Sequence, residues 1–228
     1  MDDHHRQMTM AGWAGLAFVV LALVGAFIAG SPPNPDASAA EIRDFFSDNR
    51  TALLWGGFLS TLAFPFFVGF VLVLARMMRK ATGDNLLPGA MLFSAVASIV
   101  LAMGGAAVLS GMIWVDGLVD GMADDTVSYA WNTSALLYGA TGITLFVLFG
   151  SVGVAIQRTK MMPATVGWLA GAAAVLSLVG TLSLLDADLG VLGFLSAIAG
   201  AAWVIVASIV MIGSKAAEPA PQMGAARA

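Results

Sequence analysis

Six long apolar stretches, none with an ionisable residue at its centre, constrain this chain more than any other feature. A helix needs about 20 apolar residues to cross a hydrocarbon core of roughly 30 Å. The stretches cover residues 11–30, 52–75, 88–114, 131–156, 163–184 and 189–213. A transmembrane β-barrel would instead show alternating strands of about ten residues. The sequence therefore predicts an all-α membrane protein, a bundle of six transmembrane helices within residues 11–213.

The composition excludes several classes of protein and of site. Charged residues make up 11% of the chain, against about 25% in soluble domains. The chain has no Cys, which removes disulfides and thiolate metal sites. Its two histidines, His4 and His5, precede the first apolar stretch and so lie outside the expected membrane interior. We expect no metal site and no cofactor.

Basic and acidic residues fall into different connections between the stretches. Eight of the ten basic residues lie before the first stretch, in the second and fourth connections, or after the last stretch: Arg6, Arg76, Arg79, Lys80, Arg158, Lys160, Lys215 and Arg227. Ten of the 14 acidic residues lie in the other connections. An excess of Lys and Arg in short loops marks the cytoplasmic side. We therefore expect a multi-pass membrane protein with a cytoplasmic N-terminal segment, 1–10, and a disordered cytoplasmic tail, 214–228.

The first connection predicts a short amphipathic helix on the outer face. Ser38 and Glu41 have the spacing of a capping box. Ile42, Phe45 and Phe46 follow at helical spacing. Two interpretations stay open: the helix rests its Phe residues on lipid, or it forms a lid over an outward-facing pocket. The alternative of a signal peptide cleaved at residues 37–39 is disfavoured because the preceding apolar region is too long.

Weak internal similarity suggests a repeat. Residues 49–57 (NRTALLWGG) resemble residues 132–140 (NTSALLYGA), and each segment opens a predicted helix. In the second segment, residues 132–134 are typical of an N-cap. The simplest account is three tandem parallel helical hairpins; the alternative is chance similarity between helices rich in Leu, Ala and Gly.

A proline inside the second stretch marks a candidate ligand pocket. Pro65 should kink its helix, because it lacks the N–H that the Thr61 carbonyl needs. Phe66 would give such a pocket an apolar wall, and Thr144 matches Thr61 in the suspected repeat. The candidate residues are Thr61, Pro65, Phe66 and Thr144; the alternative is a kink that serves packing alone.

An acidic group on the outer side is a candidate cation site. Its members are Asp116, Asp120, Asp124, Asp186 and Asp188. The first three would share one helix face if the third helix continued past Trp114, and clustered carboxylates suit Ca²⁺ or Mg²⁺. The alternative is a solvated acidic rim.

The stretch that follows the first helix resembles a known group of proteins. Its Pro-rich segment 32–36, the run AEIRDFF at 40–46 and Asn49-Arg50 are similar to those of bacterial six-helix integral membrane proteins common in actinobacteria. The resemblance implies the six-helix fold and a place in a bacterial inner membrane. That group has no established activity, so the resemblance implies no functional residue.

For function, the leading hypothesis is a non-catalytic membrane protein that binds lipid or an apolar ligand, or acts as an accessory subunit. The alternative is a transporter or channel for a small neutral solute, and the third choice is a membrane enzyme using the outer carboxylates. The expected partners are membrane lipids, with a second copy or another membrane protein as further alternatives. We expect no nucleic-acid partner.

Overall fold

The computed structural model describes residues 3–34, 36–186 and 189–214. Across these residues the chain is helical and forms no strand. The helices are α1 (Asp3–Ala29), α2 (Ala39–Asp48), α3 (Arg50–Thr82), α4 (Leu86–Ile113), η1 (Val119–Gly121), α5 (Asp124–Thr159), α6 (Ala164–Gly180), η2 (Thr181–Leu184) and α7 (Gly190–Gly213). Six of them are long and apolar enough to cross a membrane, so the predicted six-helix, multi-pass membrane architecture is confirmed.

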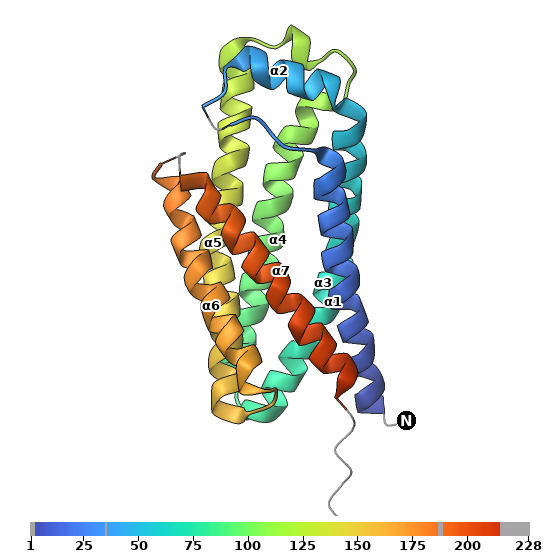
Figure 1. The fold of residues 1–228 in the computed structure, drawn as a ribbon, viewed down its shortest axis with the longest axis vertical. Coiled ribbons are helices and arrows are strands. Elements are labelled where there is room, and N and C mark those ends of the chain that lie inside the picture. The colour runs from blue at the N-terminus through green and yellow to red at the C-terminus, as the bar shows by residue number, and fades with distance from the viewer. Residues whose placement is uncertain (1–2, 35, 187–188, 215–228) are drawn as a thin grey trace, which may run out of the picture.

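The six long helices form a closed ring in chain order. Each packs against the next, and α7 returns to pack against α1. The pairs α1/α3, α4/α5 and α6/α7 are antiparallel hairpins, as the repeat predicts, although α5 and α6 also pack extensively (Figure 1). The duplication itself stays a prediction.

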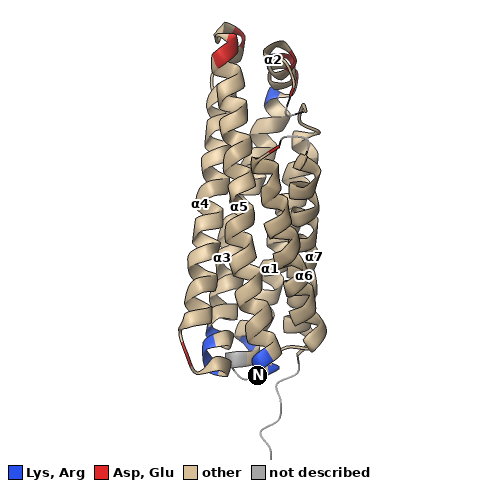
Figure 2. Cartoon of the chain, turned by 90° about the vertical axis from the view of Figure 1, so that its left-hand side faces the viewer, with Lys and Arg blue, Asp and Glu red and all other residues tan. Residues whose placement is uncertain are grey.

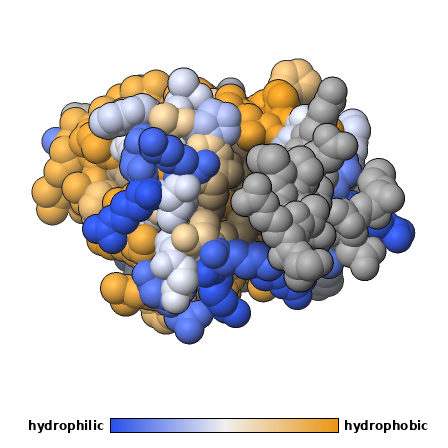
Figure 3. All heavy atoms as spheres, turned by 90° about the horizontal axis from the view of Figure 1, so that it is seen from below, coloured by the Kyte–Doolittle hydropathy of each residue, from blue (hydrophilic) through white to orange (hydrophobic). Residues whose placement is uncertain are grey.

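Charge distinguishes the two ends of the bundle. Most Lys and Arg residues lie at the end that holds the N-terminus, and most Asp and Glu residues lie at the opposite end, beside α2 (Figure 2). We call these the basic end and the acidic end. Seen from below, the visible part of the basic end gathers hydrophilic side chains, with hydrophobic ones around them (Figure 3). Such a division suits a molecule whose ends face water and whose sides face lipid.

The half of the bundle near the basic end is tightly packed around Trp203. This side chain of α7 is 1% exposed. Its ring meets Phe70 and Phe149 edge to face, at centroid distances of 6.1 and 5.3 Å. Its indole N–H donates to the Val166 carbonyl at 3.1 Å. Trp203 thus joins α3, α5, α6 and α7 in one core.

Glycine brings α1 and α7 into contact in this half. A Cβ on Gly12 would lie 2.7 Å from the Ser208 carbonyl oxygen, closer than real side chains approach. Because lipid gives no hydrophobic drive between helices, close packing of small residues is what holds such a crossing together.

At the acidic end, α5 extends beyond α6 and α7 (Figure 1). Its 36 residues span roughly 54 Å, far more than a membrane requires. The prediction that this helix opens at residues 132–134 is wrong: it begins at Asp124, and those residues lie inside it. The added turns are stabilised by protein rather than lipid, since Val127 is fully buried in a cluster with Ile42 and Phe46 of α2.

The short helix α2 lies across the acidic end of the bundle (Figure 1). It begins at the capping box that the sequence predicts, with both hydrogen bonds present between Ser38 and Glu41. The interpretation that its Phe residues rest on lipid does not fit the structure. Phe46 is 1% exposed and packs on the bundle, and Phe45 packs beside it.

Candidate functional site

A cavity of about 880 Å³ lies in the half of the bundle near the acidic end. We call it the mouth cavity. Its volume is in the range of small-molecule sites, roughly 300–1,000 Å³. It is lined by Ala26, Ala29, Gly30, Pro32, Pro33, Asn34, Asp36, Phe45, Phe46, Leu53, Leu109, Trp131, Ser134, Ala135, Tyr138, Gly190 and Val191.

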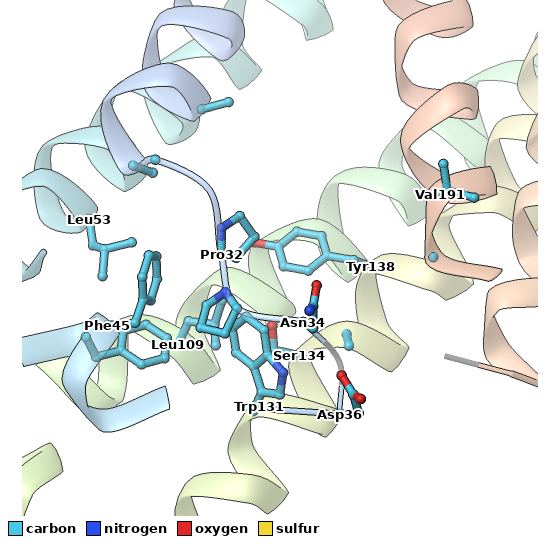
Figure 4. A pocket seen from close by; sticks show the side chains of 17 residues that line it. Pro32, Asn34, Asp36, Phe45, Leu53, Leu109, Trp131, Ser134, Tyr138 and Val191 are labelled. Carbon is cyan, nitrogen blue, oxygen red and sulfur yellow. The ribbon is translucent and has the colours of Figure 1, made fainter. Parts of the chain in front are cut away.

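Its walls come from segments far apart in the sequence. The last turn of α1, with Ala29, and the first turn of α7, with Val191, both line it. The ribbons of these two helices lie on opposite sides of the cavity (Figure 4). The connection after α1 contributes Pro32, and α2 covers the cavity with Phe45. The two helices that meet at Gly12 and Ser208 are therefore separated by the cavity at their other ends.

The lining is mostly apolar, with a few polar groups. Figure 4 shows Asn34 and Asp36 of the connection beside Trp131 and Ser134 of α5. The indole N–H of Trp131 is buried and has no hydrogen-bond partner within the described part of the chain. An apolar cavity with a few convergent polar groups is typical of a site that binds and orients a small molecule.

Two smaller cavities adjoin the mouth cavity. One of about 580 Å³ lies between α5, η2 and α7, and one of about 270 Å³ lies between α1, α3 and α4. Tyr138 lines all three. This tyrosine therefore stands at the junction of the spaces in this half of the bundle.

Polar contacts anchor α2 over the mouth cavity. Arg43 donates to the Met122 carbonyl at 2.7 Å and forms an ion pair with Asp124. The Ser47 hydroxyl donates to the Asp120 carboxylate at 2.7 Å. These contacts tie α2 to the connection between α4 and α5 and to the start of α5.

The neighbouring Arg50 serves a different contact. It donates to the Ile113 and Trp114 carbonyls, at 2.8 and 3.1 Å, where α4 ends. Its Nε lies 3.6 Å from the Asp116 carboxylate. A guanidinium at this position stabilises carbonyls that have no partner within the helix.

The N-terminus of α2 holds a carboxylate with an altered pKa. The Glu41 carboxylate accepts one hydrogen bond from the Ser38 backbone N–H and a second, with a smaller effect, from the Ser38 hydroxyl. Both hydrogen bonds lower the pKa of the Glu41 carboxyl below its ordinary value of 4.5. The charged form of Glu41 is therefore part of what holds this end of α2 in place.

The four residues of the sequence-predicted ligand pocket do not come together. Thr61 lines the 270 Å³ cavity. Pro65 and Phe66 lie on the exposed side of α3, which continues unbroken through Pro65. The Thr144 hydroxyl lies 2.6 Å from that of Ser98 and joins α5 to α4. Among the four, Thr61 is the residue that lines a described cavity.

The acidic residues of the predicted cation site are distributed among different partners. The condition that would place Asp116, Asp120 and Asp124 on one helix face is not met, because α4 ends at Ile113. Asp186 lines the 580 Å³ cavity, and Asp188 lies outside the described residues. Within the described ranges, no three His, Cys, Asp or Glu side chains are grouped so as to hold a metal ion.

Among the lining residues that the sequence did not single out, Trp131 is the clearest. A signal was available: Trp131, Ser134, Ala135 and Tyr138 follow the spacing of a single helix face. That face of α5 lines the mouth cavity.

Neither a protein-family model nor a curated protein nor a solved structure matches this chain. The case for function therefore depends on the cavity and on the residues around it.

Proposed function

We propose that the protein is a non-catalytic integral membrane protein that binds a lipid or another apolar molecule in the mouth cavity. The observation that carries this proposal is the 880 Å³ space beneath α2, lined mainly by apolar side chains. Its size and lining suit a ligand with an apolar body and a small polar group.

The arrangement of α1 and α7 supplies a route from the membrane. These helices form opposite walls of the cavity at Ala29 and Val191 and meet only further down, near Gly12. An acyl chain could enter between them while its polar group stays near Asn34 and Asp36, at the exposed edge of the cavity. The ligand would then keep the orientation that it has in the bilayer.

The charge distribution supports an orientation for the chain. Arg76, Arg79, Lys80, Arg158 and Lys160 all lie at the basic end. By the positive-inside rule, this end and both termini face the cytoplasm of a bacterial inner membrane. The mouth cavity and α2 then lie on the outer side.

Native mass spectrometry of the protein released from lipid nanodiscs tests the proposal. We expect one ligand to remain bound to the wild-type chain. Ala135→Phe should fill the cavity, because Ala135 is exposed within it, and should remove most of the bound ligand. Ala107→Phe is the matched control: Ala107 is an exposed alanine of α4 outside the lining. Equal retention by both variants would contradict the proposal.

One observation favours the alternative of a carrier for a small neutral solute. The 270 Å³ cavity continues from the mouth cavity toward Ser60 and Thr61. Such a carrier requires this cavity to open toward the basic end in a second conformation. Uptake of labelled polyols into proteoliposomes, above the leak of protein-free vesicles, would support this alternative.

A further inference from the structure

Aromatic rings gather on the covered side of the mouth cavity. Phe45 and Phe46 meet edge to face with centroids 5.6 Å apart, and Phe46 meets Trp131 in the same way at 6.0 Å. Tyr138 adds a fourth ring about two turns further along the same face of α5. Figure 4 shows the Phe45, Trp131 and Tyr138 rings around the same space.

The charge of the lining has a single sign. Asp36, which is exposed, contributes a carboxylate at the edge of the cavity, and no Lys or Arg is present among the described residues of the lining. The nearby Arg43 and Arg50 are held by backbone carbonyls and by Asp124 and Asp116 outside the cavity. An anionic group entering the cavity would meet Asp36 without a compensating cation.

Rings and a carboxylate together favour one ligand chemistry. The faces of Trp, Tyr and Phe rings attract cations, and cages of such rings recognise quaternary ammonium groups. A neighbouring carboxylate adds attraction to the same charge. The apolar remainder of the cavity would accommodate a hydrocarbon chain.

We propose that the ligand carries an organic ammonium group, held between the aromatic rings and Asp36, on an apolar body that lies toward α1 and α7. This inference rests on the proposed function and specifies its ligand class. The ammonium group could belong to the headgroup of a membrane lipid or to a free amphipathic cation.

The test compares three probes that share a dodecyl chain: dodecyltrimethylammonium, dodecylglycerol and dodecyl phosphate. Binding is measured by titration calorimetry on the full chain in nanodiscs of a neutral galactolipid, with empty nanodiscs subtracted. We expect saturable binding of the ammonium probe, about tenfold tighter than that of the other two. Equal or tighter binding of the neutral or anionic probe would overturn the inference.

Two pairs of variants locate the recognition. Asp36→Asn should weaken binding of the ammonium probe about two- to fivefold. Asp44→Asn, which removes an exposed charge of α2 outside the lining, should leave this binding unchanged. Tyr138→Leu should weaken binding of the ammonium probe about fivefold. Tyr138→Phe should bind it as tightly as the wild type does, because the ring face remains. Equal effects within either pair would contradict the assignment.

The outcomes separate this inference from the proposed function. If dodecylglycerol binds saturably and Ala135→Phe abolishes that binding, the cavity site stands and the ammonium preference is wrong. If no probe saturates, both are wrong. Where the ammonium probe binds, phosphatidylcholine added to the nanodisc identifies the source: competition supports a lipid headgroup, and lack of competition supports a free cation.

Discussion

The two halves of the bundle differ in what lies between α1 and α7. Near the basic end, Gly12 of α1 lies against the backbone of α7 at Ser208, and Trp203 closes the centre. Near the acidic end, the mouth cavity separates the same two helices, and α2 covers the space. The half near the basic end thus has a packed core, with a smaller cavity of about 430 Å³ beyond it, beside Met8, Met161 and Met211. The other half holds the covered mouth cavity.

The difference follows from where small residues let helices touch. At the acidic end, α1 makes its close contact with α3: a Cβ on Gly25 would lie 2.7 Å from the Gly56 carbonyl oxygen. At the basic end its close contact is with α7. Because lipid does not drive helices together, α1 follows these contacts and diverges from α7 along its length. The cavity is the consequence.

The largest expected effect comes from removing the centre of the packed half. Trp203→Ala should lower the free energy of unfolding by about 3–5 kcal/mol, because it empties a buried space and removes the hydrogen bond from the indole N–H to the Val166 carbonyl. Reversible unfolding in mixed micelles measures this loss. Trp131→Ala, beside the cavity, should cost much less, and the exposed Trp168→Ala almost nothing. Equal losses of unfolding free energy for the Trp203 and Trp131 variants would contradict the difference in packing between the two halves.

A smaller effect is expected from a single methyl group at the contact of α1 with α7. Gly12→Ala should destabilise the protein by about 1–3 kcal/mol, since its Cβ would overlap backbone that cannot easily move. Gly69→Ala is the matched control in α3, where a Cβ meets no atom within 4 Å. The control should be neutral or stabilising by up to about 1 kcal/mol. The same unfolding assay distinguishes the two.

A still smaller effect is expected where α2 is anchored. Arg43→Gln removes the ion pair with Asp124 and weakens the contact with the Met122 carbonyl. Partly exposed pairs of this kind contribute about 0.2–1 kcal/mol, so amide exchange in α2 should become faster while exchange in α7 stays unchanged. Lys80→Gln, an exposed charge at the basic end, serves as the control. Faster exchange throughout the bundle would contradict a local role for Arg43.

The smallest expected effect is a dependence of α2 on pH. The pKa of Glu41 is lowered by hydrogen bonds from Ser38, so the stabilisation is complete above the ordinary value of 4.5 and is lost as the pH falls through the lower folded value. Spin labels on α2 and α5 should report a broader distance distribution at acidic pH. The chain has no Cys to interfere with labelling. In Glu41→Gln, which keeps a capping side chain but not the charge, this change should disappear.

The membrane architecture could be predicted from the sequence because its signals are local. Continuous apolar stretches define the six spans, and Ser38, Glu41, Ile42 and Phe46 define α2 by spacing alone. The early start of α5 could not be predicted in the same way. Val127 is buried because α2 packs on it, and that contact joins segments some 80 residues apart in the chain.

The candidate site was less predictable because it depends on where helices diverge. Thr61 was named only because Pro65, four residues further along α3, cannot donate to its carbonyl; the cavity that Thr61 lines was not foreseen. Trp131 and Tyr138 were not considered as lining residues. Helical spacing puts Trp131 and Tyr138 on one face. It does not say whether that face meets lipid, another helix or a cavity.

The most direct test of the central claim is photocrosslinking with an uncharged monoacylglycerol that carries a diazirine near the end of its acyl chain. The full protein is irradiated in nanodiscs, and labelled peptides are mapped by mass spectrometry with and without an excess of the unlabelled monoacylglycerol. The account predicts competable labelling at Ala26, Ala29, Ala135 and Val191, which line the mouth cavity, and its loss in Ala135→Phe. Labelling confined to lipid-facing positions such as Phe27 and Phe93, insensitive to the competitor, would contradict it.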